Sequence, residues 1–177
     1  MLSELFKTEE RLKILNYVIY KDAFTTAQVA KETGVTKGLV SRYLRFLVAH
    51  QLLIKSGNEY HPLVNTWMKA IKVLLNLDKI KTDSLDLSWA KGIGVFGSSA
   101  EGTNTSESDF DIWVLVETYP SEYDLAKLQK DLRLMTGAEV NMIVLTLKKI
   151  EDLKGADPPF YNSLVRTSMV LKGESLE

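Results

Sequence analysis

Residues 94–114, GVFGSSAEGTNTSESDFDIWV, place two aspartates at the start of one of the most apolar stretches of the chain. A loop rich in Gly, Ser, Thr and Asn precedes them. Because side chains alternate along a strand, we expect Asp109 and Asp111 to point to the same side of it. Two carboxylates in one small space repel each other, and one takes a proton unless a divalent cation lies between them. The stretch therefore predicts a strand that begins at a cation site.

The composition narrows the choice of ion and ligand. The chain has no Cys and two His, which excludes thiolate metal sites and leaves oxygen ligands, the type that Mg²⁺ or Mn²⁺ prefers. Gly97 allows the backbone to approach a phosphate, and Ser98 and Ser99 offer donors to it. We expect Mg²⁺ or Mn²⁺ at the aspartates and the terminal phosphates of a ligand at the Gly97–Ser98 turn. The alternative is a polar turn in which the aspartates serve only as caps.

The motif resembles the signature of the nucleotidyltransferases of the DNA polymerase beta superfamily, most closely the minimal prokaryotic branch. The matching residues are Gly97, Ser98, Gly102, Ser108, Asp109, Asp111 and the apolar tail 112–114. The resemblance extends over about residues 89–173, where 159–173 are similar to the last helix of that branch. It implies metal binding by Asp109 and Asp111, and phosphate binding by Gly97, Ser98, Ser99 and Gly102.

The resemblance also implies a third carboxylate on a later strand, which completes the metal site and helps to deprotonate the attacking hydroxyl. Asn141 stands at the matching position, and asparagine cannot accept that proton. Glu139, two residues earlier, is the candidate substitute, although two residues span about 6.6 Å along a strand. Glu101 replaces a basic residue that is frequent in the family. These departures weaken catalysis more than nucleotide binding.

The apolar patterns of the second half predict an α+β domain over residues 86–177, with a mixed sheet and flanking helices. Strands are expected near residues 92–96, 111–116 and 139–145, and helices over about 121–135 and 159–172.

The first 61 residues predict three helices and a β-hairpin. Helical spacing covers residues 10–20, a short helix capped by Thr25 or Thr26 ends at Gly34, and a third helix runs over 37–51. Strands are expected at 52–55 and 59–60. This order, and the sequence of residues 26–55, resemble a winged helix-turn-helix. That resemblance implies that the third helix enters the major groove of double-stranded DNA.

The charge pattern agrees with that interpretation. Residues 1–64 hold nine Lys and Arg against six Asp and Glu, and no acidic residue lies between Glu32 and Glu59. The predicted DNA-binding residues are Thr36, Lys37, Ser41, Arg42, Arg45 and Lys55. The alternatives are that these charges solvate an ordinary helical module, or that the module pairs with protein.

Residues 62–85 are predicted to form a connecting helix and linker, with the helix starting at Pro62 and an apolar face that includes Val64 and Trp67. This helix either forms a homodimer contact or packs against the second domain. No apolar run is long enough for a membrane span, and the N-terminus does not resemble a signal peptide, so we expect a cytoplasmic protein with no membrane partner.

Three functions are consistent with these features. The first is a DNA-binding transcriptional regulator whose nucleotidyltransferase-fold domain binds a Mg-nucleotide. The second is an active transferase that moves a nucleoside monophosphate to a protein, nucleic acid or small hydroxyl acceptor; relatives in the minimal branch imply a HEPN-type protein as a candidate partner. The third is a scaffold without nucleotide, against which the cost of keeping two paired carboxylates argues.

Overall fold

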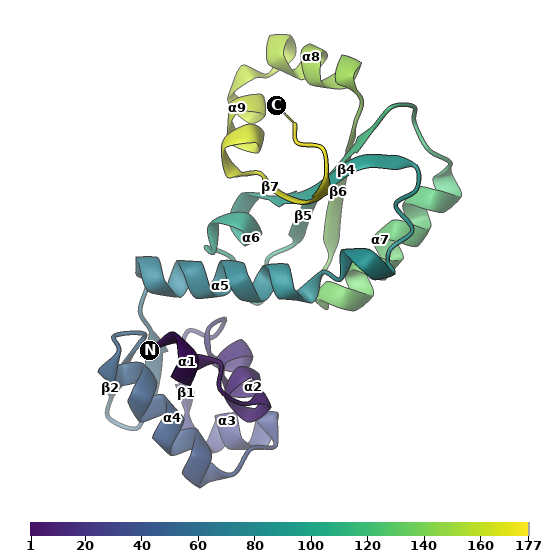
Figure 1. Cartoon of the computed structure of the whole chain (residues 1–177). Helices are drawn as coiled ribbons and strands as arrows, with labels where there is room; N and C mark the ends of the chain where they lie inside the picture. The colour runs from purple at the N-terminus through teal and green to yellow at the C-terminus, as the bar shows by residue number, and fades with distance from the viewer. Residues whose placement is uncertain (177) are drawn as a thin grey trace. The chain divides into compact units, whose positions relative to one another are not determined.

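The computed structural model describes residues 1–176, and these divide into two compact units, residues 1–71 and the residues from 72 onward. The division falls within helix α5 (Thr66–Lys79). Both units mix helices with antiparallel strand pairs, as the α+β prediction requires (Figure 1). No helix in the described part of the chain has the length and hydrophobicity to cross a membrane.

The N-terminal unit holds four helices and a three-stranded sheet. The helices are α1 (Leu2–Leu5), α2 (Glu9–Val18), α3 (Thr26–Thr33) and α4 (Lys37–Ala49). The strands are β1 (Phe24–Thr25), β2 (Leu53–Ser56) and β3 (Glu59–Pro62), in the order β1-β3-β2. The sequence predicted all of these except α1 and β1.

Helix α3 begins after a Thr25 cap and ends at Gly34, as the sequence predicts. The Thr25 hydroxyl accepts from the Gln28 backbone N–H at 3.2 Å, and the Gln28 side chain accepts from the Thr25 N–H at 2.7 Å, which forms a capping box. Gly34 ends the helix in the left-handed conformation, with φ of 71°. The predicted cap and stop are confirmed.

The start predicted for the connecting helix was wrong. Pro62 is the last residue of β3, and Val64 lies before α5 and is 90% exposed. The Asn65 side chain instead accepts from the Met68 N–H at 2.9 Å, which satisfies a donor of the first helical turn. The apolar spacing alone predicts a helix that begins before Asn65, but the Asn65 cap sets the start of the helix at Thr66.

The unit from residue 72 onward is built on a four-stranded mixed sheet in the order β6-β5-β4-β7. Its strands are β4 (Ala90–Phe96), β5 (Phe110–Val116), β6 (Val140–Leu145) and β7 (Met169–Gly173). Strand β5 pairs antiparallel with β4 and parallel with β6. The helices are α6 (Gly97–Glu101), α7 (Glu122–Thr136), α8 (Leu147–Ala156) and α9 (Pro158–Thr167), and a 3₁₀ turn spans Thr82–Ser84.

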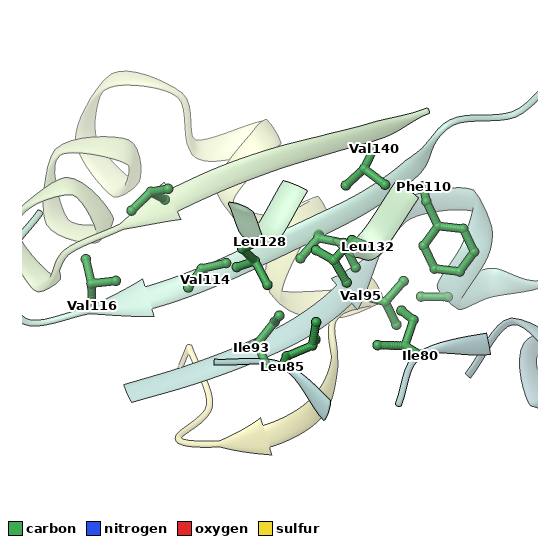
Figure 2. Close-up of a cluster of buried hydrophobic side chains, with 13 residues drawn as sticks. Ile80, Leu85, Ile93, Val95, Phe110, Val114, Val116, Leu128, Leu132 and Val140 are labelled. Atoms are coloured by element: carbon green, nitrogen blue, oxygen red, sulfur yellow. The ribbon is translucent and has the colours of Figure 1, made fainter. Parts of the chain in front are cut away.

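Strand β5 is the centre of two cores, which explains its unbroken apolar sequence. Its even-numbered residues from Phe110 to Val116 pack in one cluster with Leu128 and Leu132 of α7 (Figure 2). Trp113 and Leu115 face the opposite cluster, with Ile150 of α8 and Leu164 of α9. By alternation, Asp111 opens the same face of the sheet as Trp113.

The predicted final helix over residues 159–172 was wrong after Thr167. Helix α9 ends at Thr167, and Met169–Gly173 form β7, which pairs antiparallel with β4. Strand β4 needs a partner on its second edge, and that tertiary pairing prevails over a local helical pattern. Helix α8 was not predicted.

Candidate functional site

Asp109 and Asp111 lie close together at the end of the sheet where strand β5 begins. Asp111 is opposite Asn141 in the parallel register of β5 and β6. The Asn141 Nδ2 donates to Asp109 Oδ2 at 3.1 Å and to Asp111 Oδ1 at 3.3 Å. Both carboxylates thus lie within hydrogen-bond distance of one nitrogen. The structure brings these three side chains into one cluster.

The electrostatics of this cluster are unfavourable without a further positive group. Burial raises the pKa of the Asp111 carboxyl above its usual range, the Asn141 hydrogen bond opposes that rise, and the Asp109 carboxylate adds to it. Among residues 1–176, no Lys, Arg or His forms an ion pair with Asp109 or Asp111. The two negative charges are therefore offset by the hydrogen bonds of the Asn141 amide and not by a cationic side chain of these residues.

Glu139, the candidate substitute for the third carboxylate, does not join the cluster. Its Oε2 lies 2.7 Å from the Arg133 Nη2 at the end of α7. The described residues contain no group of three or more His, Cys, Asp or Glu arranged to hold a metal. The third position of the cluster is therefore the amide of Asn141.

The turn between β4 and α6 lies against Asp111. Gly97 has φ of +65°, and a Cβ on it would come within 2.7 Å of Asp111 Oδ2. The Gly97 N–H donates to the Thr167 hydroxyl at 3.1 Å, and Thr167 Oγ1 donates to the Ser163 carbonyl at 2.9 Å. The end of α9 thus fixes the turn beside the carboxylate.

The other residues predicted for phosphate binding continue this turn. Ser98 is half-buried and Gly102, with φ of +68°, ends α6 by donating its N–H to the Ser98 carbonyl. Ser99 is 1% exposed, and its Oγ has no hydrogen-bond partner among the described residues. Ser108 Oγ accepts from the Thr105 N–H at 2.9 Å, which orders the chain just before Asp109.

This donor set fits one hard divalent cation. Asp109 and Asp111 offer carboxylate oxygens, and rotation of the Asn141 amide presents its Oδ1 in place of Nδ2. Asp109, Asp111 and Asn141 would hold such a cation, which would supply the positive charge that offsets the two carboxylates and attracts phosphate oxygens.

Residues 77–167 match the model of the nucleotidyltransferase domain family, which is more than half of the 177-residue chain. The chain belongs to this family. The match contains the whole cluster of Asp109, Asp111 and Asn141 together with the Gly97 turn. The prediction of a nucleotidyltransferase domain is confirmed.

Several solved structures are similar to part of this chain. One, a toxin–antitoxin complex with AMP-PNP, is 24% identical, covers 62% of this chain and 75% of its own, and has a TM-score of 0.37. A mutant form of the toxin–antitoxin pair MntA–HpeT is 23% identical over 60% and 72%, also with a TM-score of 0.37. TrmBL2, an archaeal chromatin protein with a novel mode of DNA binding, is 16% identical over 90% and 71%, with a TM-score of 0.30. No curated protein matches the sequence.

The residues predicted to bind DNA lie on two elements of the N-terminal unit. Helix α4 buries Val40, Tyr43, Leu44 and Leu47. It exposes Lys37, Arg42 and Arg45, with Thr36 exposed just before it and Ser41 half-buried. Lys55, on β2, is exposed, and its Nζ lies 5.7 Å from the Tyr60 ring centroid.

A hollow of about 400 Å³ lies between the start of α3 and the β2–β3 hairpin. Its lining residues are Thr25, Thr26, Ala27, Lys55, Asn58 and Tyr60. Within residues 1–176, Arg42 and Arg45 form no ion pair. Their charges are therefore not neutralised by the N-terminal unit itself.

The sequence analysis missed the residues that support the site. Thr167 holds the Gly97 turn, and Asn76 and Asn104 are buried beside Ser99. One signal was available: Asn76 interrupts the apolar run of residues 73–77, where a polar side chain must find a buried partner.

Gly97→Ala is expected to damage the site more than the fold. A residue with a side chain in the left-handed region costs about 1–2 kcal/mol, and at Gly97 the new Cβ also displaces the Asp111 carboxylate. We expect a lower melting temperature together with loss of most of the stabilisation by Mg-nucleotide, both measured by thermal denaturation.

Gly137→Ala is the matched control. Gly137 has φ of +69°, and a Cβ added there would meet nothing within 4 Å, so this variant carries the backbone strain alone. An equal response of both variants to nucleotide contradicts a role for the Gly97 turn in the site.

Proposed function

We propose that this chain is a DNA-binding transcriptional regulator whose nucleotidyltransferase domain binds a nucleoside triphosphate with Mg²⁺ or Mn²⁺. In this proposal residues 1–61 form a winged helix-turn-helix, residues 62–85 connect, and residues 86–177 form the nucleotide-binding domain. One observation carries the nucleotide part: two adjacent carboxylates accept hydrogen bonds from the Asn141 amide beside the Gly97 turn, and no cationic side chain of residues 1–176 forms an ion pair with them.

The arrangement favours binding over turnover. Asp109 and Asp111 hold the cation, and the turn at Gly97, Ser98 and Ser99 receives the phosphates that the cation bridges. Asn141 adds no charge and cannot take a proton from an attacking hydroxyl. The bound nucleotide is therefore not consumed, which suits a regulatory ligand.

The test is the thermal stability of the full chain with ATP, GTP, CTP or UTP and Mg²⁺. Ligand at about 100 times its Kd stabilises the folded state by about 2.7 kcal/mol. For a chain of this size that corresponds to a rise of at least about 5 °C in the melting temperature. Absence of any rise with all four nucleotides rejects the proposal.

The DNA part of the proposal is supported by α4 and the hairpin. Arg42 and Arg45 are exposed one helical turn apart on α4, with Lys37 and Thr36 at its N-terminal end, the end that contacts base edges in helix-turn-helix proteins. Lys55 and the hollow beside the start of α3 offer a place for a backbone phosphate.

A second candidate function is nucleotidyl transfer to a protein, nucleic acid or small hydroxyl acceptor, with a HEPN-type protein as one acceptor. The family membership and the retention of Asp109 and Asp111 favour it. Incubation with labelled nucleoside triphosphates and cell extract tests it, because a transferase labels an acceptor.

Asn141→Asp separates the two functions. The substitution supplies a third carboxylate at the position paired with Asp111, where a second cation and a proton acceptor are otherwise missing. If the unaltered chain is a regulator, we expect it to label nothing, whereas the variant gains measurable labelling or self-labelling. Strong labelling by the unaltered chain, reduced at least tenfold by Asp109→Ala, identifies it as a transferase instead.

A further inference from the structure

Two asparagines form a buried pair behind the phosphate turn. Asn76, in the second half of α5, is 0% exposed, and Asn104, in the segment between α6 and β5, is 4% exposed. Asn76 Nδ2 donates to Asn104 Oδ1 at 3.0 Å, and Asn104 Nδ2 donates to Asn76 Oδ1 at 3.3 Å. The two amides therefore satisfy each other across 28 residues of sequence.

The same turn of α5 makes two further hydrogen bonds, one to α6 and one to the segment that follows α6. Asn76 Nδ2 also donates to the Ser99 carbonyl at 2.8 Å, and Lys72 Nζ donates to the Asn104 carbonyl at 2.7 Å. The second half of α5 thus lies alongside α6 and the chain that follows it (Figure 1). Ser99 and Asn104 lie on either side of Gly102, where α6 ends.

Helix α6 depends on such contacts for its position. It has five residues, too few for a helix to persist on its own strength. A buried amide pair accepts only one arrangement, because a shift of either partner leaves donors without acceptors. An apolar contact between α5 and α6 does not impose that restriction.

We infer that Asn76 and Asn104 are positioning residues that hold residues 99–104 in the form that receives nucleotide phosphate, so that phosphate binding and the ordering of α5 stabilise each other. This inference rests on the proposed binding of Mg-nucleotide at the Gly97 turn. Coupling between two sites is reciprocal, so nucleotide protects α5 to the extent that α5 favours nucleotide. Helix α5 begins at Thr66, within the N-terminal unit, and is the covalent route from one unit to the other.

Hydrogen exchange of the full chain, read by mass spectrometry with and without Mg²⁺ and a nonhydrolysable ATP analogue, tests the inference. In the unaltered chain we expect slower exchange over residues 97–109 and also over 72–79. The double variant Asn76→Leu/Asn104→Leu removes both partners at once, which limits the cost of unpaired buried groups. At saturating nucleotide we expect its loop to be protected and its α5 to be unprotected, with Kd raised about tenfold.

Lys72→Met carries the same test if the double variant does not fold. It leaves the amide pair intact and removes the bond from Lys72 Nζ to the Asn104 carbonyl, so we expect a smaller rise in Kd of about threefold. Lys69→Met is its control, because Lys69 is exposed on the same helix.

The outcomes distinguish the inference from the function on which it rests. No protection of residues 97–109 in the unaltered chain rejects nucleotide binding and the inference with it. Protection of 97–109 without protection of 72–79 overturns the inference and leaves nucleotide binding standing. Variants that lose thermal stability but keep the Kd and the protection of α5 show that the pair is merely structural, and this also overturns it.

Discussion

The double variant Asp109→Ala/Asp111→Ala is expected to lose the whole rise in melting temperature that we propose for the unaltered chain with Mg²⁺ and a nucleoside triphosphate. Both carboxylates lie within 3.3 Å of the Asn141 Nδ2, so they form one site, and neither is paired with a cationic side chain of the described residues. Without them the proposed cation would lose both carboxylate ligands and with them its link to the phosphates. Thermal denaturation with and without Mg-nucleotide measures the effect.

The stability of the variant without ligand is part of the same prediction. Removal of two like charges, one of them with a pKa raised by burial, relieves repulsion in the folded state. We therefore expect the ligand-free variant to melt no lower than the unaltered chain. An unchanged or higher melting temperature distinguishes the site from an ordinary structural cluster, because loss of such a cluster lowers the melting temperature.

Two controls accompany this variant. Asp109→Asn/Asp111→Asn removes the charge and keeps the size of both side chains, and it should also lose the response to nucleotide. Glu151→Ala/Asp152→Ala removes two carboxylates that are exposed on α8, and it should keep the response. A full response in either aspartate variant contradicts the metal assignment.

The sequence predicted the centre of the nucleotidyltransferase domain because local and tertiary signals agree there. Residues 112–116 are apolar on both faces, and only a strand covered on both sides needs that. The alternation of side chains predicts that Asp109 and Asp111 lie together, and this inference needs only the period of a strand. Asn141 was found through the family resemblance, and the structure adds the register of β5 with β6 that puts it opposite Asp111.

The rest depended on contacts between distant parts of the chain. Residues 169–173 have a helical pattern but pair with β4, and the hydroxyl of Thr167, the last residue of α9, accepts from the Gly97 N–H. The sequence makes Glu139 a candidate ligand, but Arg133 at the end of α7 binds its carboxylate. The Asn76–Asn104 pair joins positions 28 residues apart, and no periodic signal predicts such a pair.

Arg42→Ala/Arg45→Ala is expected to weaken DNA binding by about 100-fold at physiological salt, since each arginine contact contributes about 1–3 kcal/mol. Both arginines are exposed on α4, and neither is neutralised by an ion pair within residues 1–176. Fluorescence anisotropy with a labelled duplex of random sequence measures binding without knowledge of the operator.

The salt dependence of binding shows whether the arginines bind phosphate. Removal of one bond between a cationic side chain and a phosphate reduces the slope of log K against log salt by about 1. The slope for the double variant should therefore fall by about 2 if both side chains bind phosphate. A smaller change in slope with the same decrease in affinity assigns one or both arginines to base edges in the major groove. Either result keeps α4 as the DNA-binding helix.

Lys148→Ala/Lys149→Ala is the matched control for charge. It removes two exposed lysines from the start of α8, in the other unit, and changes the net charge of the chain by the same amount. A regulator that reads DNA through α4 loses affinity in the arginine variant and keeps it in the lysine variant. Equal weakening of both variants indicates attraction by net charge alone, and unchanged binding by the arginine variant removes α4 from the interface.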